Sequence, residues 1–363
     1  MRRTGLRWRP RLGRPSGARS VSSSPSGPAL LYHVSNLLAI VVITGVSPAS
    51  IGYTTALSTA SQAPKLLILA SRTRSKLDEV ASSIAQKHPS VNVKTVLLDL
   101  ASTDSIRSAV EEINALTDRV DVLINNAGVN PQTREPLRTP GGTTVDTQLF
   151  VNHLGPFLFT HLLLPSLRKA GEASPKGSVR VVNLSSQGHR LSPVRFSDYA
   201  FEKGVYDVPE TERPRQGLPE NFIKATNGYP GFIAYGQSKT ANILHATELT
   251  RRLRSAGANV VAFSVHPGSI ETELSRHLDP AGRATISKTA VKGLWKTQDQ
   301  GAATTLVAAF DPKLGDGEHK VGYLNECQLA DDAAAEHAAN PQLARRLWEE
   351  SERMLQISHG FRL

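Results

Sequence analysis

The sequence is poor in cysteine, in long apolar runs and, over its first part, in acidic residues. Cys327 is the only cysteine among 363 residues, which excludes an internal disulfide framework and a cysteine-based zinc cluster. We expect this side chain to fill space in the core. The apolar run at residues 37–43 is seven residues long, whereas a helix that spans a membrane needs about 20. The sequence therefore predicts no transmembrane segment.

No acidic residue precedes Asp78, and seven arginines among residues 1–19 account for most of the formal net charge of +10. This Arg-rich and Ser-rich composition is typical of a mitochondrial transit peptide, but Pro10 and Pro15 would interrupt its amphipathic helix. We interpret residues 1–34 as a disordered basic leader rather than a nucleic-acid-binding arm. A cytoplasmic location is the first expectation, and a mitochondrial one is the alternative.

From about residue 35, short β-branched runs alternate with longer stretches of helical period. This order is typical of an α/β Rossmann fold, a doubly wound parallel sheet with helices on both faces. No internal repeat or linker divides residues 35–363, so we expect a single domain. The expected strands are residues 38–43, 65–70, 91–98, 120–124, 178–184 and 259–265, each with an apolar core. The expected helices include residues 75–87, 104–116, 144–167 and 235–255.

Small residues follow the first expected strand, at residues 44–52. Gly45 and Gly52 would permit a tight turn and the close approach of a pyrophosphate to a helix N-terminus, with Ser47 and Ile51 beside it. The middle glycine of the usual dinucleotide fingerprint is missing, and Ala49 stands near its place. Taken alone the motif is weak, and an ordinary strand-to-helix turn is the alternative.

The end of the second expected strand bears on the choice of cofactor. NAD-binding proteins usually place an acidic residue there to hold the ribose 2′-hydroxyl. Here the strand is followed by Ser71 and Arg72, with Arg74 nearby. A guanidinium group suits a 2′-phosphate, so the sequence favours NADP(H) over NAD, with a solvated basic helix start as the alternative.

Tyr235 and Lys239 are four residues apart in an expected helix and so share one face. A nearby ammonium favours the phenolate, which predicts a Tyr235 pKa lowered toward the range of general acid–base chemistry. By itself the pair is common in helices, and its meaning depends on the other motifs.

Six motifs occur in an order that resembles the short-chain dehydrogenase/reductase family, over about residues 36–355. The likeness is greatest to its retinol-dehydrogenase-like and WW-domain-oxidoreductase-like members. The motifs are the glycine turn, Asp99-Leu100, Asn125-Asn126-Ala127-Gly128, Asn152 within residues 151–155, Ser185-Ser186 followed by Tyr235 to Lys239, and residues 266–272.

The resemblance implies four catalytic residues. Tyr235 would exchange a proton with the substrate oxygen, and Ser186 would orient the carbonyl group. Lys239 would bind the nicotinamide ribose, and Asn152 would hold a water that relays protons to it. The resemblance also implies that Asp99, Leu100, Asn126, Ala127, Gly128, Pro267, Gly268 and Thr272 contact the cofactor. His153 and His266 match no proton-transfer position, and we expect them to serve packing or loop hydrogen bonding.

These residues predict an NADP(H)-dependent oxidoreductase that moves hydride between the nicotinamide and a hydrophobic ketone, aldehyde or secondary alcohol. The alternative is a catalytically weak NADP(H)-binding sensor or scaffold. Nothing in the sequence predicts a metal site. Members of the family often dimerise, so a homodimer is an open expectation.

The interval of 49 residues between Ser186 and Tyr235 exceeds that of compact family members and indicates an insertion at about residues 190–231. We call this segment the insert. Its aromatic residues would either line a substrate pocket or form a small core of their own. Residues 269–297 are expected to form the substrate lid.

Overall fold

The computed structural model describes residues 39–223, 228–270, 295–315 and 318–357. The expected leader, the expected cofactor contact Thr272 and most of the expected lid lie outside these ranges. Among the described residues, no helix combines the length and apolarity that crossing a membrane requires.

An eight-stranded sheet forms the centre of the described chain, in the order β10-β9-β8-β7-β4-β1-β2-β3. All neighbouring pairs are parallel except β9 and β10. The prediction of a doubly wound parallel sheet is confirmed. The strands are β1 (Ile40–Thr44), β2 (Leu66–Ser71), β3 (Val93–Leu97), β4 (Val122–Asn125), β7 (Arg180–Leu184), β8 (Val261–His266), β9 (Tyr323–Asn325) and β10 (Gln328–Leu329).

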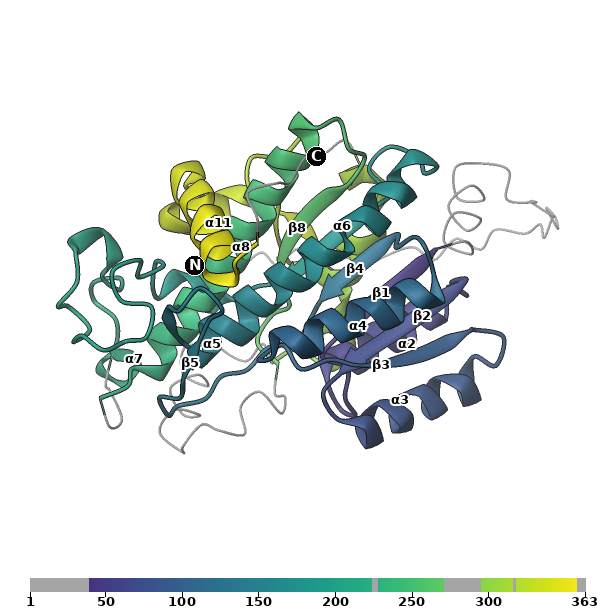
Figure 1. Ribbon diagram of the computed structural model, residues 1–363, viewed down its shortest axis with the longest axis horizontal. Helices are drawn as coiled ribbons and strands as arrows, with labels where there is room; N and C mark the ends of the chain where they lie inside the picture. Colours follow the sequence, from purple (N-terminus) through teal and green to yellow (C-terminus); the bar gives the residue numbers. More distant parts are fainter. Residues whose placement is uncertain (1–38, 224–227, 271–294, 316–317, 358–363) are drawn as a thin grey trace, which may run out of the picture.

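Helices cover both faces of this sheet (Figure 1). In β1, Ile40 and Val42 belong to one hydrophobic cluster, whereas Val41 and Ile43 belong to another on the opposite face. This alternation is the period of two expected of a strand. The first cluster includes side chains of α4 (Thr103–Leu116), α6 (Gly155–Glu172), α8 (Gly231–Ser255) and α11 (Pro341–Leu355). The second includes α2 (Ile51–Ala60), α3 (Arg74–Lys87) and α10 (Gln298–Phe310).

The prediction of one helix over residues 144–167 was wrong at its start. Thr144–Asp146 form strand β6, which pairs antiparallel with β5 (Pro136–Arg138). The Asp146 carboxylate then accepts hydrogen bonds from the Gln148 and Leu149 amides and caps the short helix α5 (Thr147–Leu149). A π-helical turn, η1 (Phe150–Leu154), leads into α6. The cap determines that helical structure begins only after Asp146.

Two further expectations fail at the edges of the sheet. In β3 only Val96 is buried, because β3 is an outer strand of the sheet. Cys327 is exposed instead of filling the core. It lies in the turn between β9 and β10, where Glu326 and Cys327 have φ of 50° and 61°. A two-residue hairpin of this kind places its side chains at the surface.

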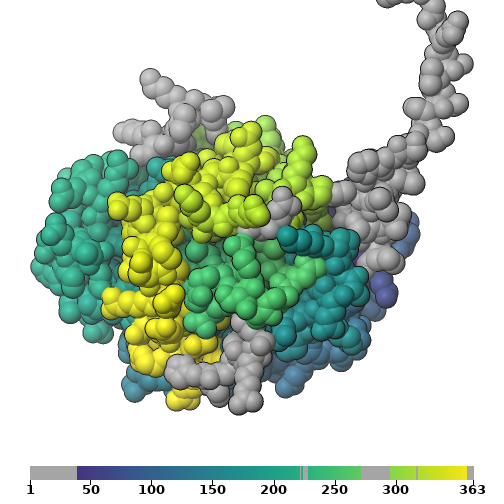
Figure 2. All heavy atoms as spheres, turned by 90° about the horizontal axis from the view of Figure 1, so that it is seen from above, coloured from purple at the N-terminus to yellow at the C-terminus, as the bar shows by residue number. Residues whose placement is uncertain are grey.

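The insert forms a bulge at one end of the molecule (Figures 1 and 2) and contains η3 (Glu210–Glu212) and α7 (Glu220–Ile223). Some of its aromatic side chains, Phe196 and Tyr199, belong to the large core cluster, and others pack into small clusters. Phe201 and Tyr229 pack with the first turn of α8, and Phe222 packs on Phe232. The structure therefore shows that most of these rings are packed, and a substrate pocket beside the insert stays a prediction.

Candidate active site

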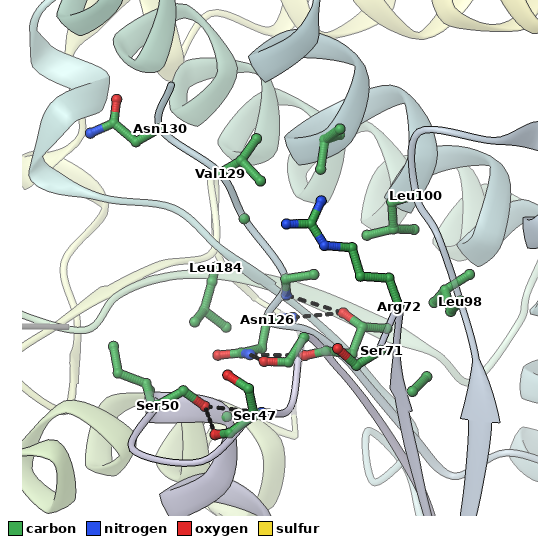
Figure 3. A pocket seen from close by; sticks show the side chains of 18 of the residues that line it. Ser47, Ser50, Ser71, Arg72, Leu98, Leu100, Asn126, Val129, Asn130 and Leu184 are labelled. Carbon is green, nitrogen blue, oxygen red and sulfur yellow. Dashed lines mark hydrogen bonds between the residues drawn. The ribbon is translucent and has the colours of Figure 1, made fainter. Parts of the chain in front are cut away.

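A cleft of about 260 Å³ opens at the carboxyl ends of the parallel strands. This is where open α/β sheets bind ligands, near the point at which the strand order reverses. Most of the predicted cofactor-binding residues line the cleft, and Figure 3 shows part of it. They are Gly45, Ser47, Ile51, Gly52, Ser71, Arg72, Asp99, Leu100, Asn126, Ala127, Gly128, Tyr235, Lys239 and Pro267. Gly268 does not line it.

The glycine turn lies directly against the turn that follows β4. Gly45 has φ of 69°, and a methyl group on it would lie 2.4 Å from Ala127 Cα. A methyl group on Gly52 would lie 2.6 Å from Asn126 Nδ2. Asn126 Nδ2 in turn donates to the carbonyl oxygens of Thr44 and Gly45, at 2.8 and 3.1 Å. Both glycines are therefore required by close packing.

Ser50 closes the glycine turn as the N-cap of α2. Its hydroxyl donates to the Ser47 carbonyl at 2.6 Å and accepts from the Tyr53 amide at 3.1 Å (Figure 3 draws the Ser47–Ser50 pair). Ala49, beside it, has φ of 54°, a conformation that favours glycine. The chain thus keeps the backbone of the turn although the middle glycine is replaced.

The end of β2 brings basic side chains to the cleft. Arg72 is exposed and turned into the cleft in Figure 3, and Lys76 lines the same region from α3. Within the described ranges, neither side chain has an acidic partner in an ion pair. Arg74 instead donates to Thr95 Oγ1 at 2.9 Å, on β3. Arg72 and Lys76 are therefore the two cations available to an anionic ligand in this part of the cleft.

Leu98, Asp99 and Leu100 follow β3 and form one wall of the cleft. The Asp99 carboxylate accepts from the Ala101 amide at 3.0 Å, and the Asp99 amide donates to Ser105 Oγ at 2.9 Å. These bonds hold the wall against the start of α4. With the leucines on either side of the carboxylate, the wall offers a flat apolar surface with a polar edge.

At the other end of the cleft, the Ser186 hydroxyl lies close enough to Tyr235 to lower the pKa of its hydroxyl. Ser186 Oγ also accepts from the Gly188 amide at 3.1 Å. A methyl group on Gly188 would lie 3.0 Å from two carbons of the Tyr235 ring, so glycine at this position leaves room for the ring. The second serine of the pair faces Tyr235, whereas Ser185 Oγ donates to the Lys239 carbonyl at 2.8 Å inside the fold.

Lys239 is 3% exposed, and its ammonium lies 5.4 Å from the centroid of the Tyr235 ring. Nζ donates to the Leu184 carbonyl at 3.0 Å. Burial lowers the pKa of Lys239 to about 8. Burial also raises the pKa of Tyr235 to about 12, although the Ser186 hydroxyl acts in the opposite direction. The expectation of a lowered Tyr235 pKa is wrong for this structure, because desolvation of the phenolate dominates.

Asn152 lies in the π-helical turn and is buried. Its Oδ1 accepts from the Val129 amide at 2.8 Å, and its Nδ2 donates to the Val129 carbonyl and to Ser238 Oγ, at 3.0 and 2.9 Å. A methyl group on Gly128 would lie 3.3 Å from Lys239 Nζ and 3.5 Å from Asn152 Oδ1. Gly128 therefore separates the two polar groups that the resemblance assigns to one proton relay.

His153 and His266 have the packing and loop roles that the sequence predicts. His153 is buried and pairs with Ser351 Oγ at 2.9 Å. His266 Nδ1 accepts from the Gln187 amide at 3.1 Å. Burial lowers the pKa of His266 to about 4. His153 thus packs against α11, and His266 holds the loop that follows Ser186.

Sequence reasoning missed several residues of the cleft, of which Lys76 is chemically the most informative. Its spacing of four residues from Arg72 at the start of a helix was an available signal. The others are Thr44, Ser50, Ala70, Thr73, Leu98, Val129, Asn130, Val151, Leu184 and Ser185.

Comparisons with known proteins show the family of the chain. The sequence model of a family described as short chain dehydrogenase matches residues 39–205. Human retinol dehydrogenase 13 is 34% identical over 321 residues, which cover 87% of this chain and 84% of that protein. The chain belongs to the short-chain dehydrogenase/reductase family.

Other relatives of this family agree. The chloroplastic short-chain dehydrogenase TIC 32 A of Brassica napus is 34% identical over 291 residues, 80% of this chain and 81% of that protein. A crystal structure from Mycobacterium paratuberculosis matches with a TM-score of 0.58 and 28% identity, over 88% of this chain and 93% of the other. The protein is therefore an oxidoreductase of the retinol-dehydrogenase-like group, which acts on CH–OH or C=O groups with a nicotinamide cofactor.

Proposed function

We propose that the protein is an NADP(H)-dependent oxidoreductase for hydrophobic ketones, aldehydes or secondary alcohols. The observation that carries this proposal is the placement of Tyr235 beside the Lys239 ammonium and the Ser186 side chain, at one end of a cleft whose other end holds Arg72. An acid–base group and an anion-binding group lie at opposite ends of one cleft, as a dinucleotide and a carbonyl substrate together require.

The cleft suits a dinucleotide in its backbone and in its charge. The two glycines of the turn allow backbone to approach a pyrophosphate at the N-terminus of α2, and Ser47 and Ile51 lie beside it. Arg72 and Lys76 would hold a 2′-phosphate, with Ser71 as a further hydrogen-bonding group. The wall of Leu98, Asp99 and Leu100 would receive the adenine. Gly268 and Thr272 stay predictions for the nicotinamide end, together with Pro267.

The bound nicotinamide would supply or accept the hydride, and the protein would manage the proton. The high pKa of Tyr235 keeps its hydroxyl protonated at neutral pH, which is the form that donates to a carbonyl oxygen. Ser186 would donate to the same oxygen and stabilise its developing charge. Lys239 would connect Tyr235 to the proton relay that Asn152 and its water would form.

The first experiment is a fluorescence titration of the purified protein with NADPH and with NADH, followed by turnover of a panel of hydrophobic and small polar carbonyl compounds. We expect selective NADPH binding, turnover of the hydrophobic members, and loss of about 100-fold or more of the activity in Tyr235→Phe. Turnover of small polar carbonyls alone would contradict the substrate proposal.

The alternative of a sensor or scaffold is motivated by Ala49, which stands near the place of the missing middle glycine and has a positive φ. It predicts NADPH binding without turnover across the whole panel. Failure to bind either nucleotide would contradict both proposals.

We further infer that residues 35–363 form the oxidoreductase domain and that residues 1–34 are a leader outside it. Removal of residues 1–34 should leave kcat/KM unchanged. A cytoplasmic location stays the first prediction and mitochondrial import the alternative.

A further inference from the structure

The helices that carry the predicted catalytic residues begin close together. Asn152 lies in the turn that follows α5, and Tyr235 lies in the first turns of α8, which begins at Gly231. Between these two helix starts lies a cluster of three buried polar side chains, Asp146, Gln148 and Tyr229. We call it the helix-start cluster.

Asp146 connects the start of α5 with the insert. Its Oδ2 accepts from the Gln148 and Leu149 amides, at 2.9 and 3.1 Å, just before the π-helical turn that holds Asn152. Its Oδ1 accepts from the Tyr229 hydroxyl at 2.5 Å. Its own amide donates to the Tyr199 carbonyl, which also belongs to the insert, at 2.9 Å.

Gln148 connects this carboxylate to α8. Its Nε2 lies 2.9 Å from the Tyr229 hydroxyl and 2.9 Å from the carbonyl of Gly231, the first residue of α8. The same nitrogen lies 3.1 Å from the Pro131 carbonyl, in the loop that continues from Gly128 and Val129. From α5, one fully buried side chain therefore contacts three other segments: the loop after β4, the insert and the start of α8.

Tyr229 is contributed by the insert and is held in place by its ring. It is 1% exposed and packs edge-on against Phe201, with 6.1 Å between ring centroids, in the cluster that includes Ile233 and Ala234. A buried hydrogen-bond network is stable only when its members keep their partners, because each unpaired group retains its desolvation cost. The position of the insert is thus coupled to the starts of both catalytic helices.

We propose that Tyr229, acting with Asp146 and Gln148, is a positioning residue that fixes Asn152 relative to Tyr235. This proposal rests on the proposed function, and it gives the insert a role in alignment of the catalytic groups. None of the three side chains lines the cofactor cleft. The cluster should therefore affect the chemical step and leave cofactor affinity unchanged.

Tyr229→Phe tests the proposal because it removes one hydroxyl and keeps the ring. We expect kcat, measured at saturating NADPH and saturating carbonyl substrate, to fall about 5- to 50-fold. The NADPH Kd and the substrate KM should stay within about twofold of wild type. Tyr199→Phe is the matched control, since Tyr199 is also a buried tyrosine of the insert but its ring packs on Phe196. This control should keep kcat within about twofold.

Hydrogen–deuterium exchange of the full chain gives a readout that needs no turnover. Tyr229→Phe should accelerate amide exchange both in Phe150–Leu154 and at the start of α8, while exchange at the glycine turn stays unchanged. Unchanged kcat in Tyr229→Phe, or faster exchange confined to the insert, would overturn the proposal. A wild-type protein that turns over no carbonyl would contradict the proposed function instead, and exchange would then decide the coupling by itself.

Discussion

Gln298 Nε2, in α10, donates a hydrogen bond of 2.8 Å to the carbonyl of Ala49 in the glycine turn. Ala49 has φ of 54°, which costs a residue other than glycine roughly 1–2 kcal/mol. Gln298 is the first residue of α10, and a methyl group on Gly301 of the same helix would lie 3.6 Å from Ile51 Cγ1. These contacts from α10 therefore stabilise the glycine turn, whose backbone would be less strained if residue 49 were a glycine.

Ala49→Gly should tighten NADPH binding. The substitution removes the backbone strain of a positive φ, so that the glycine turn can adjust to a bound phosphate. We expect the NADPH Kd to fall about 2- to 5-fold and the free energy of unfolding to rise by up to about 1 kcal/mol. A fluorescence titration and urea unfolding measure the two quantities.

Ala63→Gly is the matched control for this substitution. Ala63 also has a positive φ, of 49°, but lies in the turn after α2, away from the glycine turn. It should show a similar gain in stability with an unchanged Kd. Equal Kd values in Ala49→Gly and wild type would mean that the backbone strain at Ala49 does not limit binding.

Arg72→Ala should abolish the preference for NADPH. Loss of a charge-assisted hydrogen bond to a 2′-phosphate is expected to raise the NADPH Kd about 10- to 100-fold, with little effect on the NADH Kd. Arg74→Ala is the matched control. It removes an equal charge two residues along the chain, but the Arg74 side chain is hydrogen-bonded to Thr95, so the NADPH Kd of this variant should change less than about threefold. Equal losses in both variants would indicate a general effect of charge.

Ser186→Ala should move the pH dependence of alcohol oxidation to higher pH. Oxidation needs the Tyr235 phenolate, and the nearby Ser186 hydroxyl lowers the Tyr235 pKa. Without it the pKa rises further, so the increase of kcat/KM with pH should shift upward by up to about one unit. Ser185→Ala, whose hydroxyl faces the Lys239 carbonyl, should leave the position of the profile unchanged. Coincident profiles for Ser186→Ala and wild type would contradict the assignment.

The sheet and most of the cleft could be predicted because each depends on local sequence. Continuous apolar runs specify buried strands, and the polar residues that follow them meet at one edge of a parallel sheet. This rule predicts Arg72 at the cleft, and the family resemblance implies Asp99 and Asn126 beside it; all three line the cleft.

The remaining features depend on contacts between distant residues. Tyr235 and Lys239 have the spacing that would lower the tyrosine pKa, yet the depth of burial reverses the direction. Thr144–Asp146 continue an apolar spacing that fits a helix, but they pair with β5. The aromatic residues of the insert fit a pocket or a core equally well as a pattern, and only the structure shows which of them are packed.

Acid should destabilise the protein through histidines buried beneath α11. His245 is 3% exposed and packs on Phe157, with 5.1 Å between ring centroids. Burial lowers its pKa to about 3, below the unfolded value of about 6.5. Above pH 6.5 the imidazole is mostly neutral in both the folded and the unfolded state, so its titration does not change the free energy of unfolding. As the pH falls from 6.5 toward 3, His245 is protonated in the unfolded state but not in the folded state. The free energy of unfolding therefore falls by roughly 1.4 kcal/mol per pH unit for this residue.

His245→Gln should therefore reduce the slope of unfolding free energy against pH between about pH 6 and pH 4 by roughly that amount. The substitution itself is expected to lower stability at neutral pH, and the slope separates this loss from titration. If urea unfolding gives equal slopes for His245→Gln and wild type, His245 is protonated without cost in the fold and another group causes the acid sensitivity.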